Sequence, residues 1–231
     1  MTLTRIGAAF RSFKHNECYV FVDDKYVVLN YAPGAKKHEI LKGPLHIVAG
    51  FAMLARTPFE HGIDCAFETQ HNEAFIFSGN HCALITYGPH VPHHQHHPAR
   101  ILAGPKKIAT MFTCLHGTAF EHGIDAAIRT LDKRVLLFKG NAYALMDYHS
   151  NRVLANHYIR TGFKTLVGTV FENGIDAAFK SDKKDEAYIF KNQYYACINI
   201  DQGHPIGGHL LGGRVKRIHD DWSNLTGILN P

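Results

Sequence analysis

The chain has 231 residues, 45% of them hydrophobic and 11% aromatic, with a formal net charge of +5. This composition supports a folded core and excludes a disordered chain. The basic residues stand mostly in short pairs spread along the sequence, which is typical of solvated edges and argues against nucleic acid as a partner. No apolar stretch approaches the length of a membrane span, so we expect no membrane partner either.

A short segment recurs four times and organises the whole chain. Its copies centre on an isoleucine at positions 6, 63, 124 and 175, which are 57, 61 and 51 residues apart. Three copies contain Phe-Glu-His/Asn-Gly-Ile-Asp followed by Ala-Ala or Cys-Ala, and the first copy is the shorter Ile6-Gly7-Ala8-Ala9-Phe10. A period of this length indicates a repeated supersecondary unit.

Each repeat predicts three clear strands, a weaker fourth and a short helix. The first strand follows the isoleucine, and the second is an alternating run that ends at Phe21, Phe77, Phe138 or Phe190. Turn residues lead into a third run, which ends at Tyr31, Tyr87, Tyr148 or Ile200. Irregular segments follow, with Gly43-Pro44, Gly104-Pro105 or Gly212-Gly213 before the helix. The helix has apolar residues at i, i+4 and i+7, as in Ile47/Phe51/Leu54, Ile108/Phe112/Leu115, Ile159/Phe163/Leu166 and Ile218/Trp222/Leu225.

Four small antiparallel sheets in tandem favour a ring over a linear stack. A ring buries the alanine-rich first strands around one axis, whereas a stack needs distinct capping repeats at both ends. We therefore predict an all-β fold: a four-bladed β-propeller in a single domain, each blade a four-stranded antiparallel sheet plus a short helix. The predicted blades are residues 1–58, 59–119, 120–170 and 171–231. Ring closure then depends on packing of the terminal segments, so we expect Trp222 to be important for stability.

The cysteines indicate a reduced environment. There are five, and most lie in apolar strand-like runs without a Cys-x-x-Cys motif. This pattern predicts free buried thiols and no disulfide between the first and last blades. The N-terminus enters the first repeat at once, so we expect no signal peptide and a cytoplasmic location.

The repeats resemble a known family. Asp-Ala-Ala-Phe, then Glu-Ala-Tyr-Ile-Phe-Lys, then Ile-x-x-x-Phe/Trp-x-x-Leu is similar to the hemopexin-type repeat. Segments 102–109 and 171–179 resemble the albumin-2 family of legume seeds, and the likeness extends over essentially the whole chain. The resemblance implies a four-bladed propeller stored in the seed cytosol and a homodimer. It also implies calcium in the central channel, with sodium and chloride as further channel ions, and a polyamine such as spermine, or haem, as the ligand.

Asp64, Asp125 and Asp176 share one repeat position, which Gly7 occupies in the first repeat. A ring brings these four residues to the channel, where oxygen atoms suit a hard cation such as calcium. Because glycine offers only its carbonyl, we expect backbone carbonyls to be the ligands. The alternative is that each aspartate caps its strand or turn.

Two further sets of residues are candidates for ligand binding. Carboxylates and aromatic faces around one channel mouth suit a polyamine, unless the glutamates are merely turn residues in water. Clustered imidazoles in the loop after the third strand of the second repeat suit haem iron or a transition metal, unless the loop captures metal adventitiously. The first set is Glu60, Glu121, Glu172, Phe59, Phe120 and Phe171, and the second is His93, His94, His96 and His97.

No catalytic motif for a nucleophile, a metalloprotease or a phosphate loop is present, so we expect a protein that is not an enzyme. The sequence therefore favours a seed storage albumin that binds an axial cation and a small ligand. The alternative is a haemagglutinin-like lectin or a protein-interaction module, with carbohydrate or another protein bound to a face of the propeller.

Overall fold

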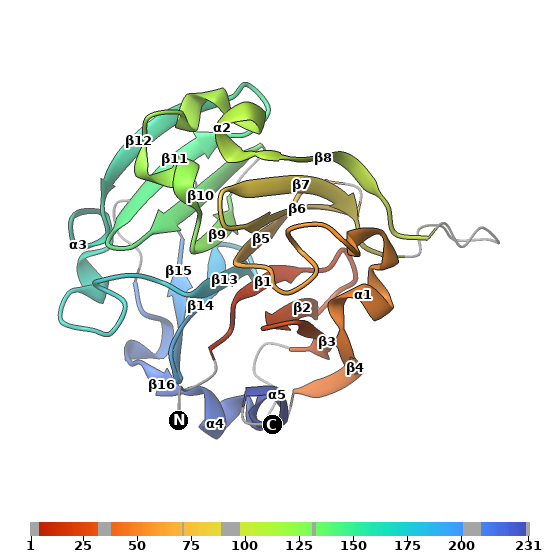
Figure 1. Cartoon of the computed structure of the whole chain (residues 1–231). Helices are drawn as coiled ribbons and strands as arrows, with labels where there is room; N and C mark the ends of the chain where they lie inside the picture. The colour runs from red at the N-terminus through yellow and green to blue at the C-terminus, as the bar shows by residue number, and fades with distance from the viewer. Residues whose placement is uncertain are drawn as a thin grey trace.

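The computed structural model describes residues 5–31, 38–70, 72–88, 98–130, 133–200 and 209–229, and in it the four repeats form four antiparallel sheets (Figure 1). Each sheet has four strands in chain order, so every strand pairs with the next one along the chain. The first two sheets contain β1 (Ala8–Arg11), β2 (Glu17–Val22), β3 (Lys25–Asn30) and β4 (Glu39–His46), then β5 (Cys65–Glu68), β6 (Glu73–Ser78), β7 (His81–Thr86) and β8 (Ile101–Lys107). The other two contain β9 (Ala126–Arg129), β10 (Arg134–Lys139), β11 (Ala142–Asp147) and β12 (Arg152–Tyr158), then β13 (Ala177–Lys180), β14 (Glu186–Lys191), β15 (Tyr194–Asn199) and β16 (Lys216–Arg217).

The four first strands close a ring. Strand β1 contacts β5 and β13, and β9 contacts the same two strands, so each inner strand touches both neighbours. Figure 1 shows the four sheets radiating from this centre. The small alanines of the inner strands allow this close approach, and the predicted four-bladed propeller is confirmed.

The hydrophobic core consists of four wedges, each between two adjacent blades. The wedge between the fourth and first blades joins Ile6 and Tyr31 to Phe179, Phe190 and Trp222. The other three wedges combine residues of blades one and two, two and three, and three and four in the same way. The terminal segments thus close the ring by packing, and all five cysteines are free.

The predicted short helix is split into two turns. In each blade a four-residue α-helix ends just before an aromatic residue and a 3-10 turn follows it. The aromatic residue interrupts the helix because its backbone angles are not helical, as at Phe51 with φ −127° and ψ 64°. The apolar residues still face the core as the i, i+4, i+7 pattern predicts. The α-helices are α1 (Ile47–Gly50), α2 (Ile108–Met111), α3 (Ile159–Gly162), α4 (Ile218–Asp221) and α5 (Thr226–Leu229). The 3-10 turns are η1 (Ala52–Leu54), η2 (Thr113–Leu115), η3 (Ala119–His122), η4 (Lys164–Leu166), η5 (Leu211–Gly213) and η6 (Ser223–Leu225).

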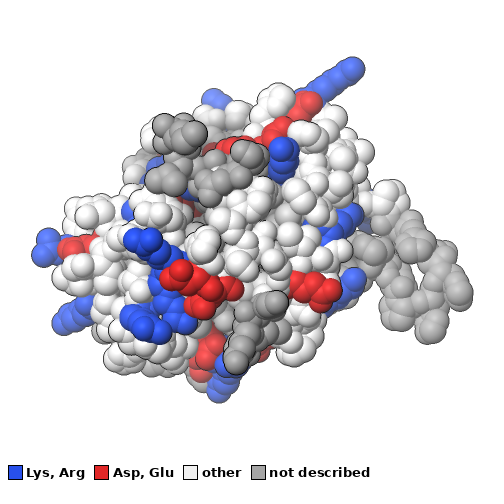
Figure 2. All heavy atoms as spheres, turned by 90° about the horizontal axis from the view of Figure 1, so that it is seen from below, with Lys and Arg blue, Asp and Glu red and all other residues white. Residues whose placement is uncertain are grey.

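The predicted weaker fourth strand is present in every blade. In blades one and two it contains Gly43-Pro44 and Gly104-Pro105, which lie inside β4 and β8, and register shifts interrupt the pairing of these strands. These irregularities accommodate the proline, which cannot donate a ladder hydrogen bond. No helix in the described part of the chain is long and apolar enough to cross a membrane. On the face that carries α4 and α5, basic and acidic side chains are intermixed (Figure 2).

Candidate functional site

The four residues predicted to line the channel gather at one end of it. Each stands directly before an inner strand, and each backbone N–H donates to the carbonyl of a phenylalanine in the second strand of its own blade, at 2.8 to 2.9 Å. A cavity of about 160 Å³ is lined by all four repeat positions, namely Gly7, Asp64, Asp125 and Asp176.

The aspartate side chains are already engaged within their own blades. Oδ2 accepts a hydrogen bond of 2.7 Å from the backbone N–H of Gly79, Gly140 or Asn192, which lie in the turn between the second and third strands. Oδ1 of Asp125 pairs with Lys139 at 2.9 Å. Oδ1 of Asp176 lies 3.7 Å from Lys191 and 3.6 Å from Arg5. Each aspartate side chain therefore caps the hairpin of its own blade.

Glycine at position 7 has a packing reason. A Cβ atom on Gly7 would lie 2.9 Å from the carbonyl oxygen of Ile63 in the next blade, closer than real Cβ atoms approach. The first blade thus reaches its neighbour through bare backbone. This contact between blades therefore leaves no room at position 7 for the aspartate that occupies the equivalent position in the other blades.

A cation could be held at these four positions by carboxylates or by main-chain oxygens. Among the residues that the structure describes, no three His, Cys, Asp or Glu side chains converge into a metal-binding group. Oδ2 of each aspartate accepts from a hairpin N–H group, and Oδ1 of Asp125 and of Asp176 lies near a lysine, so the three side chains do not form a cage of free carboxylates. A ring of main-chain oxygens is the arrangement that these four positions can supply to a hard cation.

The opposite end of the channel carries a cluster that was not predicted. The last residues of the four inner strands are Arg11, Glu68, Arg129 and Lys180, which occupy one repeat position. Glu68 is 3% exposed, and its Oε1 lies 3.8 Å from Nε of Arg11, beyond hydrogen-bonding distance. Burial raises the pKa of Glu68 although the three cations oppose this, and burial lowers the pKa of Lys180. A count of four residues beyond each channel aspartate would have revealed the cluster from the sequence.

The predicted ring of glutamates and phenylalanines has a local structural role in three blades. Phe59, Phe120 and Phe171 are at most 1% exposed and pack in the wedges between blades, so their rings present no face to solvent. Each following glutamate accepts a hydrogen bond of 2.6 to 2.8 Å from the backbone N–H four residues earlier. Glu121 also contacts His116 and His122, and Glu172 contacts Arg160. The glutamates remain half-buried, so only their carboxylates are partly accessible.

The last predicted site is the group of histidines in the second repeat. His93, His94, His96 and His97 lie outside the described residues. Cys114 lies two residues before His116, and burial raises the pKa of its thiol, which disfavours the nucleophilic thiolate.

Comparison with known proteins covers nearly the whole chain. No protein-family model matches it. Albumin-2 of Pisum sativum is 46% identical over 228 residues, which are 97% of this chain and 96% of the relative, and albumin-2 of Lathyrus sativus has the same identity. The crystal structure of a hemopexin fold protein from cow pea superposes with a TM-score of 0.92 at 43% identity, covering 98% of this chain and 99% of the other.

Two structures from Cicer arietinum carry functional descriptions. One is a plant albumin showing hemagglutination, with a TM-score of 0.90 at 48% identity over 97% of this chain and 98% of the other. The second is a plant lectin with two metal binding sites, with the same TM-score and identity over 98% and 99%. The four repeats, the ring of inner strands and this identity over almost the full length show that the chain belongs to the albumin-2 family of hemopexin-fold seed proteins.

Proposed function

We propose that this protein is a non-enzymatic seed albumin whose channel binds a hard cation, calcium in the first instance. The observation that supports the proposal is the single cavity lined by Gly7, Asp64, Asp125 and Asp176, one residue from each blade. The lectin from Cicer arietinum, described as having two metal binding sites, is a precedent at 48% identity. The main-chain oxygens of these residues would hold the ion, and its positive charge would link the four blades at the axis.

Thermal unfolding with calcium and with a chelator tests the cation. A ligand that binds only the native state adds RT ln(1 + [L]/Kd), about 2.7 kcal/mol at 100 times Kd, which raises Tm by several degrees. Asp64→Asn should weaken calcium only modestly because the ligating oxygens belong to the backbone. The control Asp220→Asn alters an exposed carboxylate outside the channel and should have no effect. Identical melting curves with and without chelator, with no metal in the purified protein, would contradict the proposal.

The basic end of the channel suits an anion such as chloride. Arg11, Arg129 and Lys180 lie around the carboxylate of Glu68, and Arg11 also pairs with Asp182 at 2.9 Å, so three cationic side chains meet two carboxylates there. Sodium is the alternative cation at the acidic end. Replacing chloride by gluconate at constant ionic strength should lower Tm if the anion is bound.

A small ligand is the second part of the proposal, with spermine as the first candidate and haem as the second. The half-buried carboxylates of Glu60, Glu121 and Glu172 are the accessible anionic groups that a polyamine would contact. Calorimetric titration with spermine and with haemin measures the affinity for each ligand. Glu121→Gln should weaken spermine binding, because it removes a charge but retains the acceptor for Gly117, whereas Glu39→Gln on exposed β4 should not. If Glu121→Gln and Glu39→Gln bind spermine with equal affinity, the polyamine site does not include Glu121.

Carbohydrate recognition is the alternative function. It is supported by the Cicer arietinum relatives described as a hemagglutinating albumin and a lectin, both 48% identical to this chain. Agglutination of erythrocytes, inhibited by simple sugars and by chelator, is the expected result. Agglutination that persists in the presence of every sugar would instead favour a protein-interaction module.

The assembly and the location complete the proposal. We propose a homodimer in the cytosol, supported for the location by five free cysteines, three of which are buried. Light scattering should give twice the monomer mass of 25.9 kDa. Fractionation of seed tissue should place the protein with cytosolic markers.

A further inference from the structure

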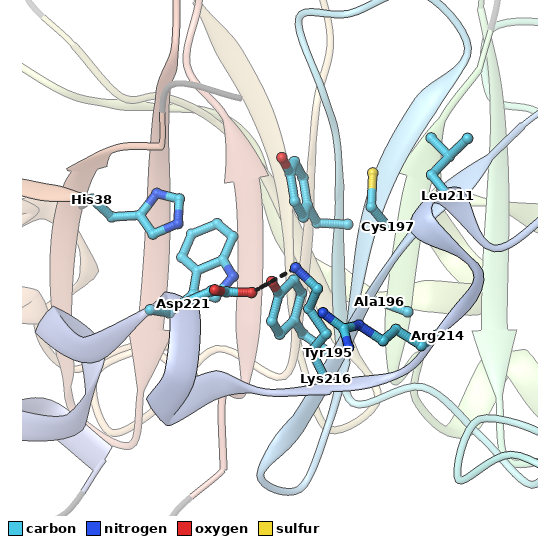
Figure 3. Close-up of a pocket in the computed structure, with 10 residues that line it drawn as sticks. His38, Tyr195, Ala196, Cys197, Leu211, Arg214, Lys216 and Asp221 are labelled. Atoms are coloured by element: carbon cyan, nitrogen blue, oxygen red, sulfur yellow. Dashed lines mark hydrogen bonds and ion pairs between the residues drawn. The ribbon is translucent and has the colours of Figure 1, made fainter. Parts of the chain in front are cut away.

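A cavity lies at the outer edge of the fourth blade, where that blade meets the first. Its volume is about 310 Å³, near the lower end of the usual range for small-molecule pockets. Figure 3 shows Arg214 and Lys216, from the segment before α4, on one side of the cavity and His38, from the first blade, on the other. Its aromatic lining consists of Tyr188, Tyr195 and Trp222.

The fourth blade differs at this cavity from other blades in two respects. Strand β16 has two residues, whereas β4, β8 and β12 have seven or eight, so β16 pairs only with Tyr194 and Tyr195 of β15. The last residue of the α-helix also differs. In blades one and three it is Gly50 or Gly162, and a Cβ there would lie 1.8 or 2.2 Å from a tyrosine hydroxyl.

In the fourth blade Asp221 occupies this glycine position. A tyrosine hydroxyl therefore cannot pack against bare backbone as it does in blades one and three, and the hydroxyl of Tyr195 instead donates a hydrogen bond to the Asp221 carboxylate. Nζ of Lys216 contacts the same carboxylate at 2.8 Å. The aspartate thus fixes one wall of the cavity.

The cavity carries excess positive charge. Hydrogen bonds from Lys216 and Tyr195 lower the pKa of Asp221, so this carboxylate is ionised and already neutralised. Arg214 is exposed and has no carboxylate within ion-pair distance among the described residues. Burial lowers the pKa of His38, which keeps the ring neutral. One arginine therefore remains for an anionic group on a ligand.

Two buried polar atoms of the lining have no hydrogen-bond partner among the described residues. They are Nε1 of Trp222, which is 1% exposed, and Nδ1 of His38, which is 7% exposed. The two rings stack with their centroids 4.0 Å apart. The indole N–H can only donate, so it requires an acceptor, and an unsatisfied buried group of this kind is costly. A carboxylate oxygen is such an acceptor.

We propose that this cavity binds a small aromatic carboxylate. The ligand ring would pack against Tyr188, Tyr195 and Trp222, where offset or edge-on contacts stabilise aromatic pairs. The carboxylate would pair with Arg214 and accept from the indole N–H, since guanidinium groups bind planar carboxylates through paired hydrogen bonds. The proposal is independent of the channel cation, because the two cavities share no residue.

Trp222 makes the test direct because it is the only tryptophan in the chain. We would titrate the full chain with benzoate, neutral benzamide and cationic benzylamine, exciting the indole selectively, with calorimetry in parallel. Benzoate should shift the indole emission saturably and bind at least about tenfold more tightly than benzamide, and benzylamine should not bind. A tenfold ratio corresponds to about 1.4 kcal/mol for the charged contact.

Two variants separate a specific site from general charge. Arg214→Gln, at an exposed position, should weaken the binding of benzoate about tenfold and leave the binding of benzamide unchanged. Arg152→Gln removes the same charge from an exposed position on β12 and should change neither. The proposal is overturned if benzoate gives no saturable shift up to about 10 mM, ten times a Kd of 1 mM. It is also overturned if benzamide binds as well as benzoate, or if Arg214→Gln has no effect.

Discussion

Removing the indole of Trp222 should open the ring of blades at its closure. The side chain is 1% exposed and lies in the wedge between the fourth and first blades. It makes edge-on contacts with Tyr188 and Phe190, at 5.4 Å between centroids, and stacks on His38 at 4.0 Å. The closure has no disulfide to support it, because all five cysteines are free.

The magnitude follows from the buried area and from the cavity left behind. A buried tryptophan removes about 150–250 Å² from water, which at about 25 cal/mol per Å² corresponds to roughly 4–6 kcal/mol. Alanine retains a small part of this area, whereas the cavity adds a cost, so Trp222→Ala should destabilise by about 3–5 kcal/mol. For a chain of this size each kcal/mol lowers Tm by about 2–4 °C, which predicts a drop of about 6–20 °C.

Urea unfolding followed by far-ultraviolet circular dichroism measures this loss without relying on the indole. Trp222→Phe is the matched control, because Phe51, Phe112 and Phe163 fill the same position in the other blades. It should cost less than half as much as Trp222→Ala. Closure of the ring by packing of Trp222 would be refuted if the Tm of Trp222→Ala were within about 3 °C of the wild-type value. It would also be refuted if Trp222→Ala and Trp222→Phe had the same Tm.

Three further substitutions test other parts of the structure. Asp125→Ala removes the cap on the Gly140 N–H and should cost about 0.5–1.5 kcal/mol, and Asp125→Asn, which retains an acceptor oxygen, should cost less in the same urea assay. Gly162→Ala places a Cβ atom 2.2 Å from the Tyr143 hydroxyl and should destabilise the fold by about 1–3 kcal/mol. The control Gly227→Ala has no atom within 4 Å of the added Cβ and should be neutral or stabilising. Equal losses of stability in the two variants would contradict the packing argument. Burial lowers the pKa of His38 below its ordinary value of 6.5, so below that pH the unfolded chain binds more protons than the folded chain. The free energy of unfolding should therefore fall as the pH drops below about 6.5, and this loss between about pH 7.5 and 5.5 should be smaller in His38→Phe. An unchanged loss in His38→Phe would assign the pH dependence to other histidines.

The fold was predictable because its determinants repeat. The alternating second strand, the alanine-rich first strand and the i, i+4, i+7 motif each occur in all four repeats, and a closed ring is the arrangement that buries them all. The split of the helix at Phe51 was not predictable, since its apolar periodicity is the same for one helix and for two successive turns. The register shifts of β4 and β8 depend on pairing with the third strand, which local sequence does not specify.

The site was predictable only in part. The position of Asp64, Asp125 and Asp176 at the axis follows from their repeat position, but the commitment of their carboxylates to the turns depends on side-chain direction. The phenylalanines beside the glutamates were expected at a channel mouth, yet Phe59, Phe120 and Phe171 are core residues. Sequence spacing gives the order of residues around a ring and not the face of the strand to which each side chain points.

The four repeats also act as an internal alignment that separates structural positions from positions free for ligands. The aspartate caps and the glutamates that accept from the N–H four residues earlier recur in three blades, and in each of these the structure shows a local bond that explains the residue. Where equivalent positions differ, no common structural requirement holds them. This is the case for Arg11, Glu68, Arg129 and Lys180 at one end of the channel, and for Gly50, Met111, Gly162 and Asp221 at the ends of the helices. Glu68 of the first set is buried among cationic side chains, and Asp221 of the second set lines the cavity of the fourth blade, so in a repeat protein the departures from the repeat are one place where ligand specificity is to be sought.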